Sequence, residues 1–350
     1  MDVKNLWQIY VDTIIKLVPK PPLPAAIGID IGTSNIKLIE LARCSGGFEL
    51  RNFKIEPFES ATVSAVLKKL IDGVGLSNQT LVVAVSGKGT LIRYVDVPKM
   101  SNDDLRKSLA YELDKYFPFD PSSIYYDCHI IDENLPDKKM AALVTAVKKD
   151  LVDERLRIFK QAGQELNKIT TNAIATANAF GELAQPNEAA SHAKGLLDIG
   201  GSLSNLMIIQ NRSPRFTRDI YIGANDLTRQ IANVLGVDAA SAEALKISGE
   251  RGEEVLNACE DTIANLVGEV RLSLDYFITE RNINVDELFV VGGGAKMNGL
   301  TAVLEKHLGI PVKVWQPLAG LKLSTTVAQT DIFNHAPQLG VALGLALSGL

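Results

Sequence analysis

The chain reads Ile29-Asp30-Ile31-Gly32-Thr33-Ser34 near its N-terminus and Leu197-Asp198-Ile199-Gly200-Gly201-Ser202 in its second half. In both copies an aspartate ends an apolar strand, a turn that contains glycine follows, and a second apolar strand returns over residues 36–41 or 205–210. Two such copies in one chain indicate an internal duplication. We therefore expect two similar β-hairpins that face each other.

The turn of each hairpin is suited to hold phosphate oxygens. Consecutive backbone N–H groups point into such a turn, and glycine lets the main chain approach an anion with no side chain in between. Hydroxyl and amide side chains can add donors, and Lys37 can bring positive charge to a β- or γ-phosphate. The candidate phosphate-binding residues are Gly32, Thr33, Ser34, Asn35 and Lys37 in the first hairpin and Gly200, Gly201 and Ser202 in the second.

Asp30 and Asp198 are the candidate ligands of a magnesium ion and the candidate catalytic carboxylates. Mg²⁺ is usually bound through one or two carboxylates and keeps several of its waters. With a triphosphate held between the two hairpins, both carboxylates would lie beside the metal, directly or through water. The duplicated motif therefore predicts a site for a magnesium nucleotide.

A third element follows the apolar strand expected over residues 288–291. It contains Gly292, Gly293, Gly294 and Lys296, and it precedes a helical pattern over residues 300–307. Successive glycines expose bare backbone on which a flat adenine and its α-phosphate can lie. Three glycines alone are a weak signal, but their position after two phosphate hairpins favours a complete ATP site.

Other kinds of site are disfavoured by spacing and composition. Residues 87–90 lack the spacing of a P-loop, and no G-x-G-x-x-G follows a strand as dinucleotide binding requires. The net charge of −5 gives no attraction to nucleic acid. Cys44, Cys128 and Cys259 lie too far apart for a C-x-x-C metal site or a disulfide framework. No apolar run approaches the roughly 18 to 20 residues of a membrane span.

The first 24 residues are expected to form a separate segment ahead of the first strand. Apolar residues at helical spacing over 3–18 predict an amphipathic helix, and four prolines between Pro19 and Pro24 predict a stiff linker. This helix either packs on its own domain or contacts a membrane surface or a partner.

Beyond Pro24 the pattern is that of an α/β protein. Strands are expected over 27–31, 37–42, 48–55 and 80–85, with a helix over 61–71. Between residues 90 and 164 the order changes to strand, helix, strand, strand and helix, with the first helix over 101–116. This change predicts a small inserted α+β subdomain.

The sequence resembles the PilM family of type IV pilus assembly proteins, which are relatives of the cell-division protein FtsA in the superfamily of actin and the sugar kinases. The resemblance covers roughly residues 25–350 in collinear order. The motifs that carry it are residues 28–41, Tyr111 to Phe119, residues 197–201, Phe216 to Ile220, residues 290–294 and the C-terminal stretch 337–346.

This resemblance implies an actin-like fold with ribonuclease H-like duplicated lobes and an FtsA-type (SHS2-like) inserted subdomain. The implied divisions are 25–96 with 168–190 for lobe I, 97–167 for the insertion, and 191–350 for lobe II, whose C-terminal helix returns towards lobe I. The implied cofactors are ATP and Mg²⁺, with Glu243 and Lys246 reaching ribose and adenine. The alternative for this pair is a solvated helix face.

The resemblance also implies a partner and a location. The partner is the N-terminal cytoplasmic tail of a PilN-like inner-membrane protein, bound beside the insertion, and other pilus assembly components are further candidates. Tyr116, Phe117 and Phe119 lie near that region, unless they are ordinary core residues. The implied location is the cytoplasmic face of the inner membrane, and residues 1–18 offer a peripheral membrane contact.

The sequence departs from its relatives at two places. Relatives that hydrolyse ATP have an acid or glutamine where this chain has Asn172, and relatives often have two glycines where this chain has Gly223-Ala224. Asn172 can hold a water but is no base, so we expect slow or negligible ATP turnover. Two alternatives remain at this point, a filament-forming protein of the FtsA type and a small-molecule kinase. A kinase would need a further carboxylate facing an open cleft, and an FtsA-like protein would be expected to carry a C-terminal amphipathic helix.

Overall fold

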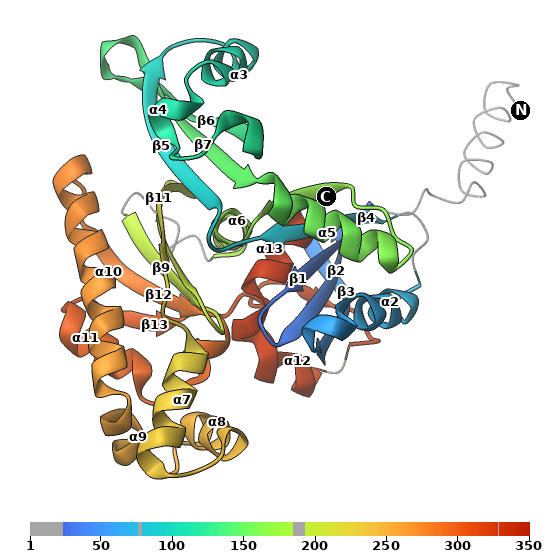
Figure 1. The fold of residues 1–350 in the computed structure, drawn as a ribbon, viewed down its shortest axis with the longest axis vertical. Coiled ribbons are helices and arrows are strands. Elements are labelled where there is room, and N and C mark those ends of the chain that lie inside the picture. Colours follow the sequence, from blue (N-terminus) through green and yellow to red (C-terminus); the bar gives the residue numbers. More distant parts are fainter. Residues whose placement is uncertain (1–23, 76–78, 185–192, 328) are drawn as a thin grey trace, which may run out of the picture.

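The structure, a computed structural model, describes residues 24–75, 79–184, 193–327 and 329–350. The helix expected over residues 3–18 lies outside them. Within the described residues three sheets form the framework of the molecule (Figure 1). None of the helices in this part of the chain is both long and apolar enough to cross a membrane.

The first sheet has the strand order β14-β3-β2-β1-β4-β8. Its strands are β1 (Ala25–Ile31), β2 (Asn35–Cys44), β3 (Gly47–Pro57), β4 (Thr80–Val85), β8 (Lys168–Thr171) and β14 (Lys322–Leu323). Side chains alternate between the two faces of a strand, so Ile27 and Ile29 of β1 share one face. On that face they pack with buried residues of α2 (Val63–Asp72) and α5 (Lys149–Gln161).

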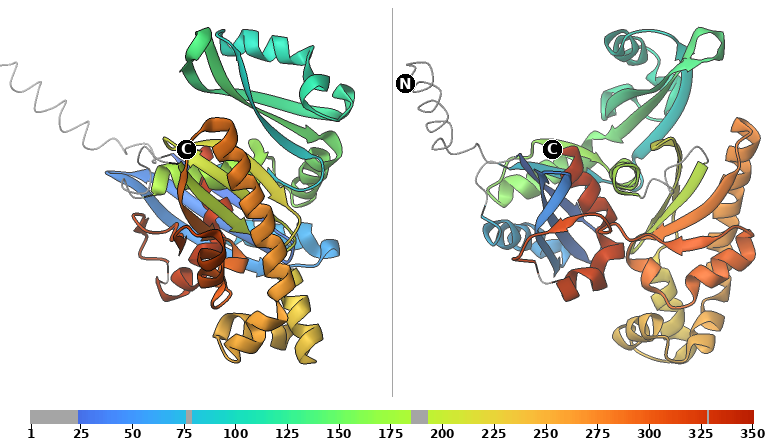
Figure 2. Two further views of the ribbon diagram at one scale, coloured as in Figure 1. Left: turned by 90° about the vertical axis from the view of Figure 1, so that its left-hand side faces the viewer. Right: turned by 180° about the vertical axis from the view of Figure 1, so that it is seen from behind.

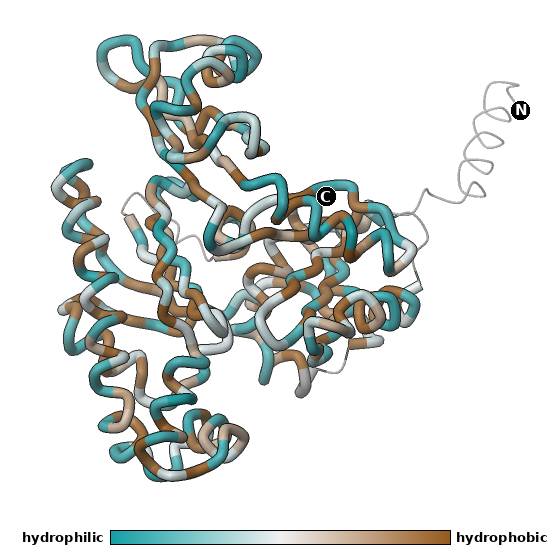
Figure 3. Tube along the Cα trace, viewed as in Figure 1, coloured by the Kyte–Doolittle hydropathy of each residue, from teal (hydrophilic) through white to brown (hydrophobic). Residues whose placement is uncertain are grey.

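The second sheet has the strand order β11-β10-β9-β12-β13. Its strands are β9 (Ala193–Ile199), β10 (Ser204–Gln210), β11 (Ser213–Ile220), β12 (Val285–Val291) and β13 (Val312–Val314). Its outer core includes residues of α7 (Ala224–Leu235), α9 (Gly252–Ala258), α10 (Glu260–Arg281) and α11 (Leu300–Leu308). Apolar and hydrophilic residues alternate along outer helices such as α10, as expected when one face is buried (Figure 3).

Two helices lie between these sheets and join them. The core here contains Leu41 of β2 and Met207 of β10 together with Phe180 of α6 (Asn172–Leu183) and Leu343 of α13 (Gly340–Ser348). The C-terminal helix α13 also packs on β1, and the right-hand view of Figure 2 shows the red helix beside the blue strands of the first sheet. The two lobes therefore share a continuous apolar core.

The expected duplication of the hairpins is confirmed. Asp30 of β1 is paired across the hairpin with Lys37 of β2, and Asp198 of β9 is paired in the same way with Asn205 of β10. Each turn is closed by a hydrogen bond from a glycine N–H, to Asn35 O in the first hairpin and to Leu203 O in the second, both at 3.0 Å.

A three-stranded sheet with the order β5-β7-β6 forms the inserted subdomain (upper part of Figure 1). Its elements are β5 (Thr90–Pro98), α3 (Asn102–Ala110), α4 (Leu113–Tyr116), β6 (Ile124–Leu135) and β7 (Lys139–Lys148). The single helix expected over 101–116 is thus two helices with a break after Ala110. Tyr116, Phe117 and Phe119 belong to this subdomain's own core, which favours the structural role of these residues.

The bounds 97–167 expected for the insertion stay a prediction, and the packing of the flanking elements is as follows. β5 pairs along its whole length with β7, so the small sheet begins at Thr90. In contrast, Ile158 and Phe159 of α5 are buried against the first sheet. The helix that follows the insertion therefore packs with lobe I.

Candidate functional site

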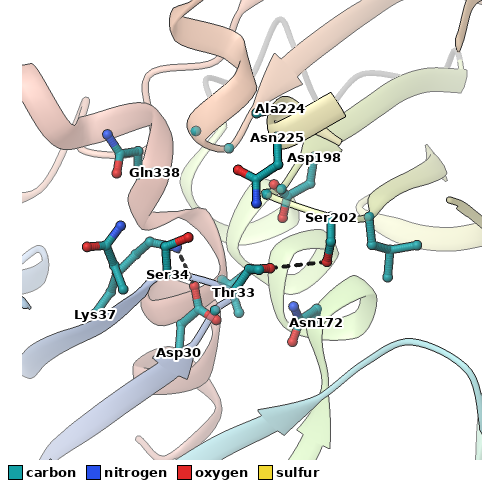
Figure 4. A pocket seen from close by; sticks show the side chains of 18 of the residues that line it. Asp30, Thr33, Ser34, Lys37, Asn172, Asp198, Ser202, Ala224, Asn225 and Gln338 are labelled. Carbon is teal, nitrogen blue, oxygen red and sulfur yellow. Dashed lines mark hydrogen bonds and ion pairs between the residues drawn. The ribbon is translucent and has the colours of Figure 1, made fainter. Parts of the chain in front are cut away.

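A polar cavity of about 660 Å³ lies where the two hairpins and the glycine triplet meet. This volume is in the usual range for ligand pockets. Figure 4 shows side chains from both hairpins pointing into it. The expected site residues that line it are Asp30, Gly32, Thr33, Ser34, Asn35, Lys37, Asn172, Asp198, Gly200, Gly201, Ser202, Glu243, Lys246, Gly292, Gly293 and Lys296.

Figure 4 marks two polar contacts among the side chains of the hairpins. Lys37 Nζ lies 2.7 Å from Asp30 Oδ2, and the hydroxyl groups of Thr33 and Ser202 lie 3.1 Å apart. The second contact joins the two hairpin turns directly. Burial alone would lower the pKa of Lys37, but its ion pair with Asp30 and the nearby charge of Asp198 raise it above the ordinary value. Lys37 is thus a fixed cation on the cavity wall.

Asp198 is buried on the facing wall, and its Oδ2 accepts a hydrogen bond of 3.3 Å from the Thr176 hydroxyl. Burial raises the pKa of Asp198 to about 6, and the negative charge of Asp30 adds to this shift. A cation placed beside Asp198 would favour its ionised form. Two carboxylates that feel each other's charge at one end of a polar cavity fit a magnesium ion that keeps most of its waters.

The glycines of the third turn have different roles. A Cβ on Gly292 would lie 2.4 Å from Asp198 Oδ1, and one on Gly294 would lie 2.2 Å from Ile199 Cγ2. These two glycines therefore allow the turn to pack against the second hairpin. Gly294 is not among the residues that line the cavity, contrary to its expected role in supporting the base. A Cβ on Gly293, in contrast, would meet no atom within 4 Å.

Glu243 and Lys246 line the cavity from α8 (Ala239–Ser248). Lys246 is buried, so the solvated-face alternative is wrong for this residue. Its Nζ donates to Glu243 Oε2 at 2.6 Å and to the Thr228 hydroxyl at 2.8 Å, and Thr228 also donates to Glu243 at 2.7 Å. These bonds hold the half-exposed Glu243 carboxylate in place, where it can accept hydrogen bonds from hydroxyl groups.

Several lining residues were missed by the sequence analysis. Two of them are Arg155 on α5 and Asn225 on α7. The backbone N–H of Asn225 donates to Gly201 O at 2.8 Å. Burial lowers the pKa of Arg155 from its ordinary value, although Glu154 and Asp30 oppose this shift. No local motif marks these residues, because they reach the cavity only through the packing of their helices. The other missed residues include Ser86, Asn205, His335 and Gln338.

A second large cavity of about 640 Å³ is a groove between the inserted subdomain and the first sheet. Strand β6 is at the edge of the small sheet and β8 at the edge of the first, and both line this groove. Its walls include apolar side chains of Ile131 on β6, Val152 on α5 and Ile174 on α6. An edge strand presents unpaired backbone N–H and C=O groups.

Comparison with known proteins supports this interpretation of the fold. The chain is similar to a structure described as a PilM-PilN type IV pilus biogenesis complex, with a TM-score of 0.80 and 23% identity, over 93% of this chain and 98% of that one. It is less similar to the ethanolamine utilization protein EutJ from Carboxydothermus hydrogenoformans, with a TM-score of 0.54 and 16% identity, over 94% and 91% of the two chains.

A third similar structure is MreB 5 of Spiroplasma citri bound to AMPPNP, with a TM-score of 0.51 and 14% identity, over 93% and 95% of the two chains. These likenesses confirm the expected actin-like α/β fold. A family model described as type IV pilus assembly protein PilM matches residues 28–350. Since that match covers most of the sequence, the chain belongs to the PilM family of type IV pilus assembly proteins.

Proposed function

We propose that the chain binds ATP with Mg²⁺ between its lobes and uses the closed form to hold a membrane-anchored partner. The observation that carries this proposal is the convergence of both hairpin turns and the glycine triplet on one polar cavity. The backbone N–H groups of the turns and the Lys37 ammonium group would hold the phosphates. Asp30 and Asp198 would hold the metal, and Glu243 would accept hydrogen bonds from the ribose.

Gly293 offers a steric test of this site. Replacing Gly293 by valine puts methyl groups into open space on the cavity wall, so the fold should be unaffected. The methyl groups would then overlap with bound nucleotide. We expect the affinity for Mg-ATP, measured by calorimetry, to fall at least about 10-fold, because overlap with bound ligand costs more than about 1.4 kcal/mol. The matched control is Gly252→Val. Gly252 also begins a helix, and a Cβ there would also meet no atom within 4 Å, but this residue does not line the cavity. Equal affinities of the two variants would contradict the site.

Hydrolysis in this site should be slow. The acidic residues that line the cavity, among the residues the structure describes, are Asp30, Asp198 and Glu243. The first two have the metal as their proposed ligand, and Glu243 lies at the proposed ribose end. Asn172, at the start of α6, can orient a water but cannot take its proton. A steady-state rate above about one turnover per second would contradict this part of the proposal.

The groove between β6 and β8 is the proposed site for the N-terminal cytoplasmic tail of a PilN-like membrane protein. An extended peptide can hydrogen-bond to the backbone of an edge strand while alternate side chains enter apolar pockets. Both features occur in the groove, which has β6 and β8 on its walls and apolar residues between them. Its occupant is proposed by likeness to the PilM-PilN complex. The chain would then act at the cytoplasmic face of the inner membrane, as part of the pilus assembly platform.

Ile131 is the residue with which to test the groove. It lines the groove and is not part of the subdomain core that includes Ile130. Replacing Ile131 by aspartate should weaken binding of a PilN-like tail peptide at least about 10-fold, because a bound apolar side chain would bury the new charge. Calorimetry with and without Mg-ATP measures this, with Leu272→Asp on exposed α10 as the control. Failure of the wild-type protein to bind the peptide in either condition would count against the partner and leave the nucleotide site untouched.

A further inference from the structure

A smaller cavity of about 230 Å³ lies next to the nucleotide pocket and has no role in the function proposed above. Ser86, Asn172 and Asn205 line both cavities, so these three residues stand at the junction between them. Most of the other lining residues belong to β5 and β11, including Thr90 and Asp219. Thr90 Oγ1 is buried and has no hydrogen-bond partner among the described residues. A polar cavity of this size with an unpaired hydroxyl group is suited to hold ordered water.

One row of side chains crosses the second sheet towards this cavity. The strand registers place Asp198, Asn205 and Asp219 directly opposite one another on β9, β10 and β11. Residues that are opposite on neighbouring strands point to the same face of the sheet. The buried Asn205 amide therefore lies between the proposed metal ligand Asp198 and the carboxyl group of Asp219.

The contact within this row fixes the orientation of the amide. Asn205 Nδ2 donates a hydrogen bond of 2.6 Å to Asp219 Oδ1. A carboxylate can only accept, so the NH₂ end of the amide must face Asp219 while that group is ionised. The carbonyl oxygen Oδ1 then faces away from Asp219. Since Asn205 also lines the nucleotide pocket, this oxygen is available to accept a hydrogen bond there.

We propose that Asp219 is a positioning residue, which holds the Asn205 amide so that its Oδ1 orients the water that attacks the last phosphoryl group of the nucleotide. This inference rests on the proposed binding of ATP. The oxygen of that water forms a bond to the γ-phosphorus while the bond from the γ-phosphorus to the bridging oxygen breaks, and that electron pair leaves with ADP. One proton of the water passes to an oxygen of the transferred phosphoryl group, so that ADP and dihydrogen phosphate are the products. Asn172 also lines both cavities. The amides of Asn172 and Asn205 are not bases, so hydrolysis should be slow.

The pH dependence gives a readout that a purely structural role would not produce. Burial raises the pKa of Asp219 to about 6, although the bond from Asn205 opposes this shift. The charged groups around the cavity are Arg93 on β5 and Arg218, which is paired with Glu269. Tyr221 also lines it, and Lys88 lies 5.6 Å above the Tyr221 ring. As pH falls through about 6, protonated Asp219 gains an O–H donor, the amide is free to turn, and hydrolysis should decline.

The first test measures the nucleotide-free protein. With ¹⁵N-labelled asparagine side chains, the Asn205 Nδ2 signal is assigned by its loss in Asn205→Asp. It should shift with a midpoint near pH 6 in the wild type, and in Asp219→Asn the part of this shift that comes from Asp219 should disappear, while the part that comes from the neighbouring Asp198 remains. A matched control is Glu40→Gln, because Asn52 Nδ2 donates to Glu40 at 2.5 Å in the other lobe, and this variant should leave the Asn205 signal unchanged. An Asn205 signal that is insensitive to Asp219 overturns the proposal.

The second test is single-turnover hydrolysis of Mg-ATP in parallel with calorimetric affinity. Asp219→Ala should slow hydrolysis at least about 10-fold with affinity retained, because a misplaced reacting group loses rate more than binding. Asp219→Glu keeps a carboxylate that can accept from the Asn205 amide, so it should retain more of the rate than Asp219→Ala. Burial also raises the pKa of Asp198 to about 6. The pH profiles of the wild type and Asp219→Asn are therefore compared, and the contribution of Asp219 is the difference between them.

The outcomes distinguish the proposed nucleotide binding from the proposed role of Asp219. A wild-type protein that binds no nucleotide contradicts the proposed function, while the signal of Asn205 still tests its orientation. A protein that binds ATP but never hydrolyses it, or an Asp219→Ala variant with the wild-type rate and pH profile, overturns the role of Asp219 and leaves nucleotide binding intact.

Discussion

Replacing Lys37 by methionine is expected to lower the affinity for Mg-ATP by about 100-fold or more. The ammonium group is the cation of the first hairpin and is held at the cavity wall by Asp30 at 2.7 Å. A hydrogen bond to a charged group contributes about 1.5 to 3 kcal/mol, and the variant also leaves the Asp30 carboxylate without its partner next to the phosphates. Calorimetric titration with Mg-ATP measures the change.

The control for this variant is Lys194→Met. Lys194 is likewise a lysine on a strand with little exposure, and it is paired with Glu287 outside the cavity that holds Lys37. Both variants remove a buried ion pair, so both should lose stability to urea. Only the Lys37 variant should lose affinity for the nucleotide. A Lys37→Met protein that binds ATP as tightly as Lys194→Met would show that the first hairpin does not hold the phosphates.

Replacing Gly344 by alanine is expected to destabilise the fold by about 3 kcal/mol or more. A Cβ at this position would lie 1.7 Å from the backbone oxygen of Ala175 on α6, and on the neighbouring face of α13 a Cβ on Gly28 would lie 2.0 Å from Ala342 O. Helix α13 is thus confined between α6 and β1 by backbone atoms, which cannot move aside as a side chain can. Overpacking of this kind costs about 1 to 3 kcal/mol and sometimes more.

The matched control is Gly268→Ala, in the middle of the exposed side of α10. A Cβ there would meet no atom within 4 Å. Alanine is a better helix former than glycine by about 1 kcal/mol, so this variant should be slightly more stable than the wild type. Urea unfolding of both proteins measures the difference. A Gly344→Ala variant as stable as Gly268→Ala would contradict the close packing of α6 and α13.

The hairpins and the glycine triplet were predictable because their signals are local. An aspartate at a strand end followed by a glycine turn specifies both the hairpin and the place of its carboxylate, and the register confirms this for Asp30 and Asp198. The order of the three motifs along the chain then predicted one shared site. The family resemblance rested on these segments together with Tyr111 to Phe119, Phe216 to Ile220 and residues 337–346.

The features that were missed depend on contacts between distant elements. Arg155 lies on a helix that was expected to close the insertion, yet that helix packs on lobe I and brings the guanidinium group to the cavity. Gly294 was expected to support the base but packs against Ile199, because the turn bends there towards the second hairpin. Asp219 and Asn205 form a pair only through strand register, which no periodicity in either strand reveals.

The most direct test of the account is a crystal structure of the protein with Mg²⁺ and a non-hydrolysable ATP analogue. We expect one nucleotide in the cavity, with its phosphates against the turns that follow Asp30 and Asp198, and its base end near Gly293 and Glu243. A nucleotide bound elsewhere, or an empty cavity at a saturating concentration of the analogue, would contradict the shared site.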